Sequence, residues 1–283
     1  MIVKTMHGLQ AAACLQHRDV ARRCGRHFIH CRGSRRARGC RSARGVSGEG
    51  TVIEHRKLSD LGGEDIGWLK AKHHFAVGSY GNPAHTALGN LFVFNDDEIA
   101  PGTGFPLHPH ANVEIVTYVR EGAITHRDSL GNEGRTSAGN VQVMSTGTGI
   151  RHSEANAETS PTKIFQIWLW PRQAGGTPRW GNRPFPKSNR AGRLVLLASG
   201  FENESEALPI RADARVLGAT LQTGQRLSYE LGQGRMAYIV PARGDVVING
   251  VEVHSREGAA IRQEQHIEIE AKNDSEILLI DAA

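Results

Sequence analysis

Two histidines separated by one residue, His108 and His110, are the side chains of this sequence best suited to chemistry. Residues two apart on a β-strand project to the same face, so the two imidazoles are expected to point together. Glu114 has the same parity and can join them. Two imidazoles that converge on one face suit a borderline divalent metal such as iron, nickel, copper or zinc. The stretch therefore predicts half of a metal site.

His152 and Glu154 form a second pair, also two residues apart, after a glycine-punctuated stretch. If the two pairs lie on neighbouring strands, they form a four-ligand site with space for water, dioxygen or substrate. Three imidazoles and one carboxylate suit redox-active iron or copper better than a closed structural zinc site, which usually contains thiolates. A lone histidine, by contrast, is usually a surface residue or a satisfied core residue. We interpret the following histidines in that way: His73, His74, His85, His126, His254 and His266.

The elements around these pairs are expected to be short β-strands. From about Thr51 onward, runs rich in Val, Ile, Thr, Tyr and Phe alternate with Gly, Asn, Asp and Pro clusters. This pattern is typical of an all-β sandwich or barrel. The strands expected before residue 171 are 113–119, 123–127, 141–145 and 163–170. Residues 128–133 predict a hairpin turn in which Gly131 and Asn132 can take positive φ.

A Pro- and Gly-rich stretch at 171–189 is interpreted as a linker or crossing loop. Short strands are expected to resume after it, at 193–198, 215–222, 236–240, 245–248, 267–269 and 276–280. Their number and spacing resemble the first half. The sequence therefore predicts two β-domains, 51–175 and 190–283, without a long amphipathic helix.

The net charge of +5 comes from the first fifty residues alone. They contain eleven Lys/Arg and two acidic residues, a balance of +9, so the rest of the chain sums to −4. The basic overall composition therefore gives no support to direct nucleic-acid binding. All four cysteines also lie in residues 1–50, which excludes disulfides and thiol catalysis from the remainder. No stretch approaches the roughly 20 apolar residues of a membrane-spanning helix, so a soluble, cytoplasmic protein is expected.

Residues 1–50 show neither helical periodicity nor strand alternation. The Arg-, Gly- and Ser-rich segment 32–44 has no apolar anchor, so this basic leader is expected to be disordered. In the interpretation favoured here, it is a tail without function, translated upstream of a true start near Thr51. A second interpretation is an Arg-rich targeting peptide. A third is a zinc site built from the four cysteines and nearby histidines, although no two cysteines have the short spacing of zinc ligands.

The stretch around the histidine pairs resembles the cupin superfamily. Its first motif, G-x5-H-x-H-x3,4-E-x6-G, is matched by Gly102, His108, His110, Glu114 and Gly122, with one additional residue before the last glycine. Its second motif, G-x5-P-x-G-x2-H-x3-N, is matched by Gly139, His152 and Asn156, with Ser145 in place of the proline and two additional residues before the histidine.

These departures from the cupin motifs resemble the pirin family. The matching segments are 105–110, 114–118, 121–122, 126–129, 147–154 and 166–168. The likeness extends over about 51–283, and Gly67-Trp68-Leu69 resembles the family's opening strand. It implies a bicupin, meaning two tandem cupin-type β-barrels, with metal only in the N-terminal barrel. Residues 1–50 have no counterpart in the family.

The pirin resemblance also implies a ligand set. One divalent ion, Fe²⁺ in the first instance and otherwise Ni, Cu, Co or Zn, would be held by His108, His110, His152 and Glu154. Spacing alone leaves Glu114 open as the carboxylate ligand, as in ordinary cupins. The resemblance favours Glu154 and gives Glu114 an outer or structural role.

Several pirin-like proteins are described as quercetin 2,3-dioxygenases, which open a flavonol ring with dioxygen. The resemblance therefore implies a flavonol-like substrate and O₂. The metal would act as a Lewis acid on the 3-oxygen of the flavonol, with Glu154 as the candidate general base and Glu114 in reserve. Two other functions stay open: a metal-dependent, redox-sensing regulatory protein with a protein partner, and a cupin isomerase or hydrolase.

Overall fold

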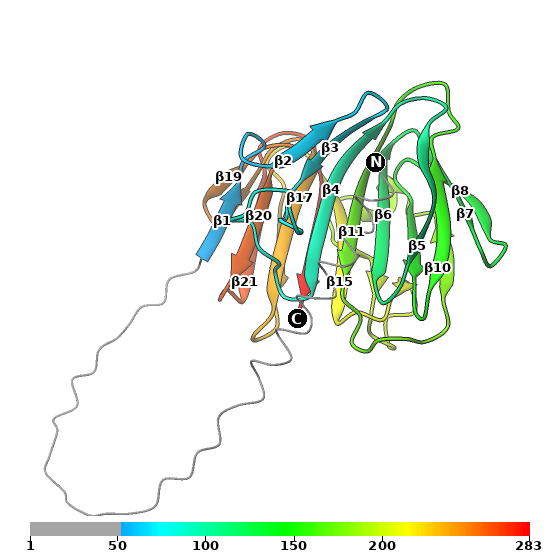
Figure 1. Cartoon of the computed structure of the whole chain (residues 1–283). Helices are drawn as coiled ribbons and strands as arrows, with labels where there is room; N and C mark the ends of the chain where they lie inside the picture. Colours follow the sequence, from blue (N-terminus) through cyan, green and yellow to red (C-terminus); the bar gives the residue numbers. More distant parts are fainter. Residues whose placement is uncertain (1–51) are drawn as a thin grey trace, which may run out of the picture. The chain divides into compact units, whose positions relative to one another are not determined.

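A computed structural model of the chain describes residues 52–283, which belong to one compact unit, Thr51–Ala283. The predictions made for residues 1–50 lie outside the described residues. The unit is built of strands in four sheets (Figure 1). Within residues 52–283 the sole helical element is a short 3₁₀ helix, η1 (Lys187–Arg190), and none is long and apolar enough to cross a membrane. The predicted all-β, bicupin fold class is confirmed.

The N-terminal half combines a seven-stranded and a four-stranded sheet. In sheet order, the larger one contains β12 (Arg179–Arg183), β9 (Val141–Ser145), β6 (Glu114–Glu121), β11 (Thr162–Leu169), β4 (Leu91–Ile99), β3 (Leu69–His73) and β2 (Gly62–Asp65). The smaller one contains β5 (Gly104–His110), β10 (Ile150–Ala155), β7 (Ala123–Asp128) and β8 (Glu133–Ser137).

The C-terminal half repeats this arrangement of seven and four strands. Its larger sheet contains β1 (Val52–Arg56), β20 (Gly258–Arg262), β17 (Met236–Arg243), β22 (Ser275–Ala282), β15 (Ala214–Leu221), β13 (Val195–Ser199) and β14 (Leu208–Pro209). Its smaller sheet contains β16 (Arg226–Glu230), β21 (His266–Ala271), β18 (Val246–Ile248) and β19 (Val251–Val253).

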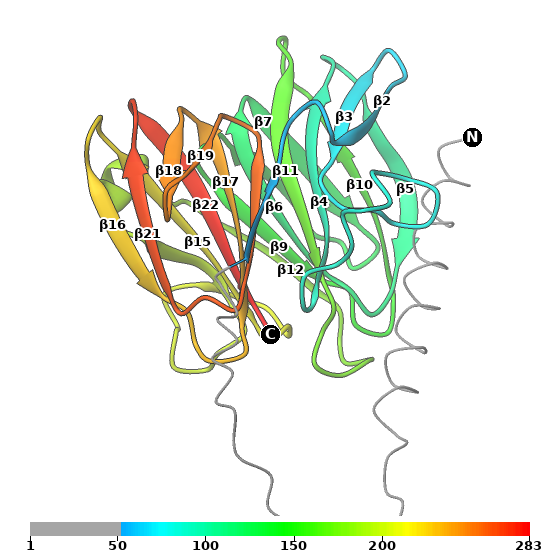
Figure 2. The same ribbon diagram turned by 90° about the vertical axis from the view of Figure 1, so that its left-hand side faces the viewer.

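Successive side chains of β11 point alternately into two different environments. Phe165 and Ile167 join an apolar core that includes Tyr238 of the C-terminal half. Gln166 projects to the opposite side, where it bonds to Glu154 of the smaller sheet. The two large sheets therefore share one apolar core, and the two halves lie side by side in Figure 2. The interior of the N-terminal half is polar at its centre.

The interior of the C-terminal half is filled with aliphatic side chains. The larger sheet contributes Leu217, Ile239, Ile261 and Leu279, and the smaller sheet contributes Ile248, Ile267 and Ile269. Burial of such surface stabilises a fold by about 25 cal/mol per Å². This half can therefore be stable without a bound ligand at its centre.

The first strand, β1, crosses between the halves. It precedes the strands of the N-terminal half but pairs with β20 over its whole length (Figure 1). Its last residue, Arg56, is fully buried and donates from Nη1 to the carbonyl oxygen of His74 at 2.8 Å. The guanidinium also lies 4.5 Å from the centre of the Phe75 ring. The domain bounds 51–175 and 190–283 remain predictions, and β1 lies in the sheet of the C-terminal half.

A buried ionic group connects the halves near η1. Arg190, 1% exposed, donates to Glu276 of β22 at 2.9 Å and to the hydroxyl of Tyr118 of β6 at 2.7 Å. The Tyr118 hydroxyl also donates to Glu276, and Lys187 reaches the second carboxylate oxygen at 2.6 Å. Burial lowers the pKa of Arg190 to about 10, so this guanidinium stays charged at neutral pH.

Each predicted strand overlaps an observed one, and β9 has its predicted bounds. The predicted hairpin joins β7 to β8 with Gly131 at φ 88°, but Asn132 does not take positive φ. The expected opening strand begins only at Leu69, because Gly67, at φ 87°, forms the preceding turn.

The prediction of a loop over 171–189 is wrong in part. This stretch contains β12 and the start of η1. β12 is an edge strand that pairs with β9 through its backbone, and its side chains are exposed or half-buried. A strand held at a sheet edge by backbone pairing does not need alternating apolar side chains. Strands are predicted from that alternation, so this one was missed.

Candidate metal centre

Two neighbouring strands bring the three predicted histidines together. β10 pairs with β5 so that His152 lies opposite His108, and His110 follows two residues along β5. The ring centroids are 4.4 Å apart for His108 and His152, 4.7 Å for His108 and His110, and 5.1 Å for His110 and His152. All three are buried, and one ligand atom from each lies within 4.8 Å of the others.

The ring nitrogens show that this cluster fits a metal ion. His108 Nδ1 lies 2.7 Å from the carbonyl oxygen of Pro106, so Nδ1 carries the proton and Nε2 is the nitrogen with the lone pair that can ligate a metal. His152 Nε2 is buried without a hydrogen-bond partner among residues 52–283. A buried polar atom in that state costs free energy, which coordination would recover. Burial, together with the neighbouring histidines, lowers the pKa of His152 well below its usual range, so the neutral, ligating form prevails.

Glu154 adjoins the histidine cluster through His152. The two share β10, with a register shift between them in the pairing to β5. The carboxylate oxygens accept hydrogen bonds from Gln142 and, at 2.8 Å, from Gln166. Burial raises the pKa of Glu154 to about 7, although both amides oppose the rise. A ligand atom of Glu154 lies within 4.8 Å of His126 and His152, which makes a second possible trio.

Glu114, the reserve carboxylate, faces away from the histidines. The parity argument fails because the chain turns at Asn112, at φ 56°, between β5 and β6. The Glu114 carboxylate accepts a hydrogen bond from Ser145 Oγ at 2.5 Å and from the backbone N–H of Arg211 at 3.0 Å. Burial raises the pKa of Glu114. Within residues 52–283 it belongs to neither cluster of possible metal ligands, so the expectation from parity that it joins His108 and His110 is corrected.

His126, interpreted from the sequence as an ordinary histidine, lies against the site. Its Nδ1 is 3.4 Å from His152 Nδ1, and its Nε2 is 3.1 Å from Asp128 Oδ2. The ring stacks on Trp180 of β12, with centroids 4.7 Å apart and an interplanar angle of 5°. Burial lowers the pKa of His126 against the opposing effect of Asp128. The signal in the sequence was the spacing of two between His126 and Asp128, which puts an imidazole and a carboxylate on one face of a strand.

A further carboxyl lies in the interior of the N-terminal half. Asp97 of β4 is opposite Ile164 of β11, two residues from Gln166, so it projects to the same side as Gln166. It is 2% exposed, and its Oδ1 has no hydrogen-bond partner among the described residues. Burial raises the pKa of Asp97 well above its usual range, and the charges of Asp96 and Glu154 add to the effect.

We expect Asp97→Asn to gain thermal stability relative to the wild type as pH rises from 5 to 8. A raised pKa in the folded state means that folding binds a proton above the ordinary pKa of aspartate, so the wild type loses stability as pH rises toward the folded-state pKa. An uncharged amide removes that loss. Thermal unfolding of both proteins in chelator at the two pH values measures the difference in stability. The control is Glu252→Gln, at an exposed carboxyl of β19. A difference that does not depend on pH would contradict the prediction.

Comparisons with known proteins agree with this fold. The Pirin family model matches residues 54–169, and the model of the quercetinase C-terminal cupin domain matches residues 196–282. A pirin-like protein of Caulobacter vibrioides is 57% identical over 232 residues, which is 82% of this chain and 100% of the relative. The chain belongs to the pirin family.

Two further relatives of this pirin have names that bear on chemistry. A quercetin 2,3-dioxygenase of Escherichia coli K12 is 38% identical over 231 residues, 81% of this chain and 98% of the relative. The crystal structure of the bacterial pirin YhhW from Escherichia coli in complex with nickel(II) aligns with a TM-score of 0.77 and 37% identity. That alignment covers 82% of this chain and 99% of YhhW.

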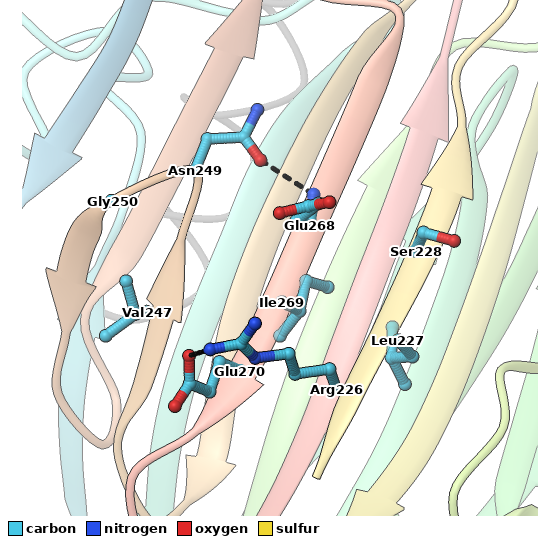
Figure 3. A pocket seen from close by; sticks show the side chains of 9 residues that line it. All are labelled: Arg226, Leu227, Ser228, Val247, Asn249, Gly250, Glu268, Ile269 and Glu270. Atoms are coloured by element: carbon cyan, nitrogen blue, oxygen red, sulfur yellow. Dashed lines mark hydrogen bonds and ion pairs between the residues drawn. The ribbon is translucent and has the colours of Figure 1, made fainter. Parts of the chain in front are cut away.

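The pirin also has a surface hollow of about 430 Å³ over β16, β18 and β21 of the C-terminal half (Figure 3). Three of its polar side chains already bond within the hollow. Arg226 pairs with Glu270 at 2.8 Å, and Asn249 accepts a hydrogen bond from the backbone N–H of Glu268 at 2.6 Å (Figure 3). The hollow and the histidine cluster lie in different halves, and we assign the candidate chemistry to the cluster.

Proposed function

We propose that this chain is a metal-dependent dioxygenase of the quercetin 2,3-dioxygenase type, which opens a flavonol ring with O₂. The proposed ligands of its divalent ion are His108, His110, His152 and Glu154. The observation that carries the proposal is the buried trio of histidines, in which His152 Nε2 lacks a hydrogen-bond partner among the described residues. The proposed metal is Fe²⁺, with Ni, Cu, Co and Zn as alternatives.

Two comparisons support the proposal. Nickel in the YhhW structure supports a divalent metal in a protein of this fold. The name of the Escherichia coli K12 relative supports an oxidoreductase that acts on a flavonol with O₂. Imidazole ligands alone accept several divalent metals, so the choice of iron rests on the proposed reaction.

The proposed roles follow from the positions of the side chains. When bound, the metal would supply Lewis-acid polarisation of the flavonol 3-oxygen. Glu154 would accept the proton of the 3-hydroxyl as a general base. Gln142 and Gln166 hold its two carboxylate oxygens and so fix its direction. Trp168, 4.9 Å from His110 between ring centroids, packs against the cluster and limits its exposure to water.

Oxygen uptake tests the proposed function. The full chain is reconstituted anaerobically with Fe²⁺, and in parallel with Ni²⁺, and mixed with quercetin and O₂. We expect uptake by the wild type and none above background by His108→Ala. Metal content per chain is measured in the same samples. A protein with one metal per chain and no uptake with either ion would contradict the dioxygenase proposal and favour the redox-sensing alternative.

Glu154→Gln separates the ligand role of Glu154 from its role as a base. Glutamine keeps the shape of the side chain but cannot accept the proton from the flavonol. If Glu154 is the base, the variant retains its metal and loses ring opening, by about 100-fold or more. If the variant loses its metal, the result supports a role of Glu154 as a ligand and gives no support to a role as a base. Full activity with full metal content would contradict the proposed base.

A further inference from the structure

His126 lies between a proposed metal ligand and a carboxylate. Its Nδ1 faces His152 Nδ1 at 3.4 Å, and its Nε2 faces Asp128 Oδ2 at 3.1 Å. The rings of His126 and His152 are buried, at 0% and 2% exposure. The pairing of β10 with β7 sets this order, because it puts His152 opposite Asp128 and Glu154 opposite His126. The three side chains form a line from the histidine cluster to the β7–β8 turn.

One arrangement of protons gives every contact in this line a donor and an acceptor. A neutral imidazole that ligates through Nε2 carries its proton on Nδ1. His152 Nδ1–H then donates to His126 Nδ1, which leaves the proton of His126 on Nε2. That Nε2–H donates to Asp128 Oδ2. Both histidines are neutral, and the carboxylate is ionised.

The far end of the line is held firmly. Asp128 accepts hydrogen bonds from the backbone N–H of Asn132 at 3.1 Å and from its side-chain amide at 2.9 Å. The His126 ring stacks on Trp180 at 4.7 Å between centroids. Space for Trp180 depends on Gly134, where a Cβ atom would lie 2.3 Å from the indole ring. The imidazole of His126 is thus fixed in both position and rotation.

We infer that His126 and Asp128 are positioning residues of the metal site. They hold His152 with its proton on Nδ1 and its Nε2 directed to the metal. The negative charge of the carboxylate also makes that Nε2 a stronger electron-pair donor to the metal. Outer partners of this kind are worth about 10–100-fold in metal affinity. The inference rests on the proposed metal site. It adds two residues outside that ligand set.

Isothermal titration calorimetry of the full chain with Ni²⁺ tests the inference. We compare the wild type with His126→Phe, which keeps a ring against Trp180 but removes both nitrogens. We expect the Kd for Ni²⁺ to rise about 10–100-fold. Asp128→Asn, which keeps an oxygen acceptor but removes the charge, should raise the Kd by a smaller factor. The control is His254→Phe, at an exposed histidine, which should bind nickel like the wild type.

A second measurement gives an answer even if a variant fails to fold. The ¹⁵N shifts of histidine in the zinc-loaded wild type report which ring nitrogen carries the proton. We expect His152 to be protonated on Nδ1 and metal-bound through Nε2, with His126 protonated on Nε2. Coordination of zinc by His126 itself, in the trio with His152 and Glu154, would overturn the inference.

The outcomes separate the inference from the proposal on which it rests. Wild-type protein that binds no nickel and no zinc would contradict the metal site and the inference with it. Wild-type binding, with an unchanged Kd in both His126→Phe and Asp128→Asn, would overturn only the positioning role. A raised Kd in both variants, together with the expected protonation states, would establish it.

Discussion

His152→Ala is expected to abolish the binding of one divalent ion per chain and to reduce quercetin-dependent oxygen uptake to background. His152 contacts both other histidines of the cluster and also belongs to the second group of possible ligands, with Glu154 and His126. Its removal therefore affects both possible trios. A residue that only hydrogen-bonds to a metal ligand accounts for about 10–100-fold in metal affinity. Loss of a ligand itself should therefore lower the metal affinity by more than about 100-fold. Metal analysis after gel filtration and oxygen uptake measure the two effects.

The control for His152→Ala is His254→Ala, at an exposed histidine of the C-terminal half, which should keep both properties. Circular dichroism of the variant establishes that the strands have formed. A folded His152→Ala protein that retained one tightly held metal per chain would show that the histidine cluster is not the metal site.

Glu276→Ala is expected to lower the free energy of unfolding by about 3–5 kcal/mol. Arg190 is 1% exposed, and Glu276 is its carboxylate partner at 2.9 Å. Removal of one member of a buried ion pair leaves the other charge desolvated and uncompensated, which costs more than the pair contributes. Lys187 and Tyr118 lose the same acceptor. Burial raises the pKa of Glu276 to about 7, so urea unfolding at pH 8, where the carboxylate is ionised, gives the difference.

Glu270→Ala provides the matched control for Glu276→Ala, because Glu270 is also a glutamate on a β-strand paired with an arginine. Figure 3 shows this pair. The side chain of its arginine, Arg226, is 74% exposed. An exposed pair contributes about 0–1 kcal/mol, so this variant should unfold almost like the wild type. Equal losses in the two variants would show that the buried pair has no special role between the halves.

The strands of the described residues were predicted well where one face meets a core. β9 and β11 alternate between an apolar core and a packed interior, and their sequences, VQVMS and TKIFQIWL, are rich in apolar side chains. β12 was missed because it is held by backbone hydrogen bonds at a sheet edge. The pairing of β1 with β20 could not be predicted either, because it joins residues about 200 positions apart and no local pattern marks it.

The histidines of the site were predictable from spacing, since a separation of two within one strand fixes the face. The same argument failed for Glu114 because the chain turns at Asn112 before β6 begins. The stacking of His126 on Trp180 needed the tertiary structure: the two residues come from different sheets and meet only when β12 has paired with β9. Local spacing therefore predicts the ligands, whereas the residues that support them depend on the assembled fold.

The crossing of β1 has a consequence for how the molecule unfolds. Arg56 at the end of this strand binds the backbone of the N-terminal half while the strand itself completes a sheet of the C-terminal half. Either half expressed as a separate fragment would lack part of its framework. Melting of one half would release a strand or a buried guanidinium of the other, so calorimetry of residues 51–283 should give one cooperative transition. The two halves, although built as separate pairs of sheets, should therefore behave as a single thermodynamic domain.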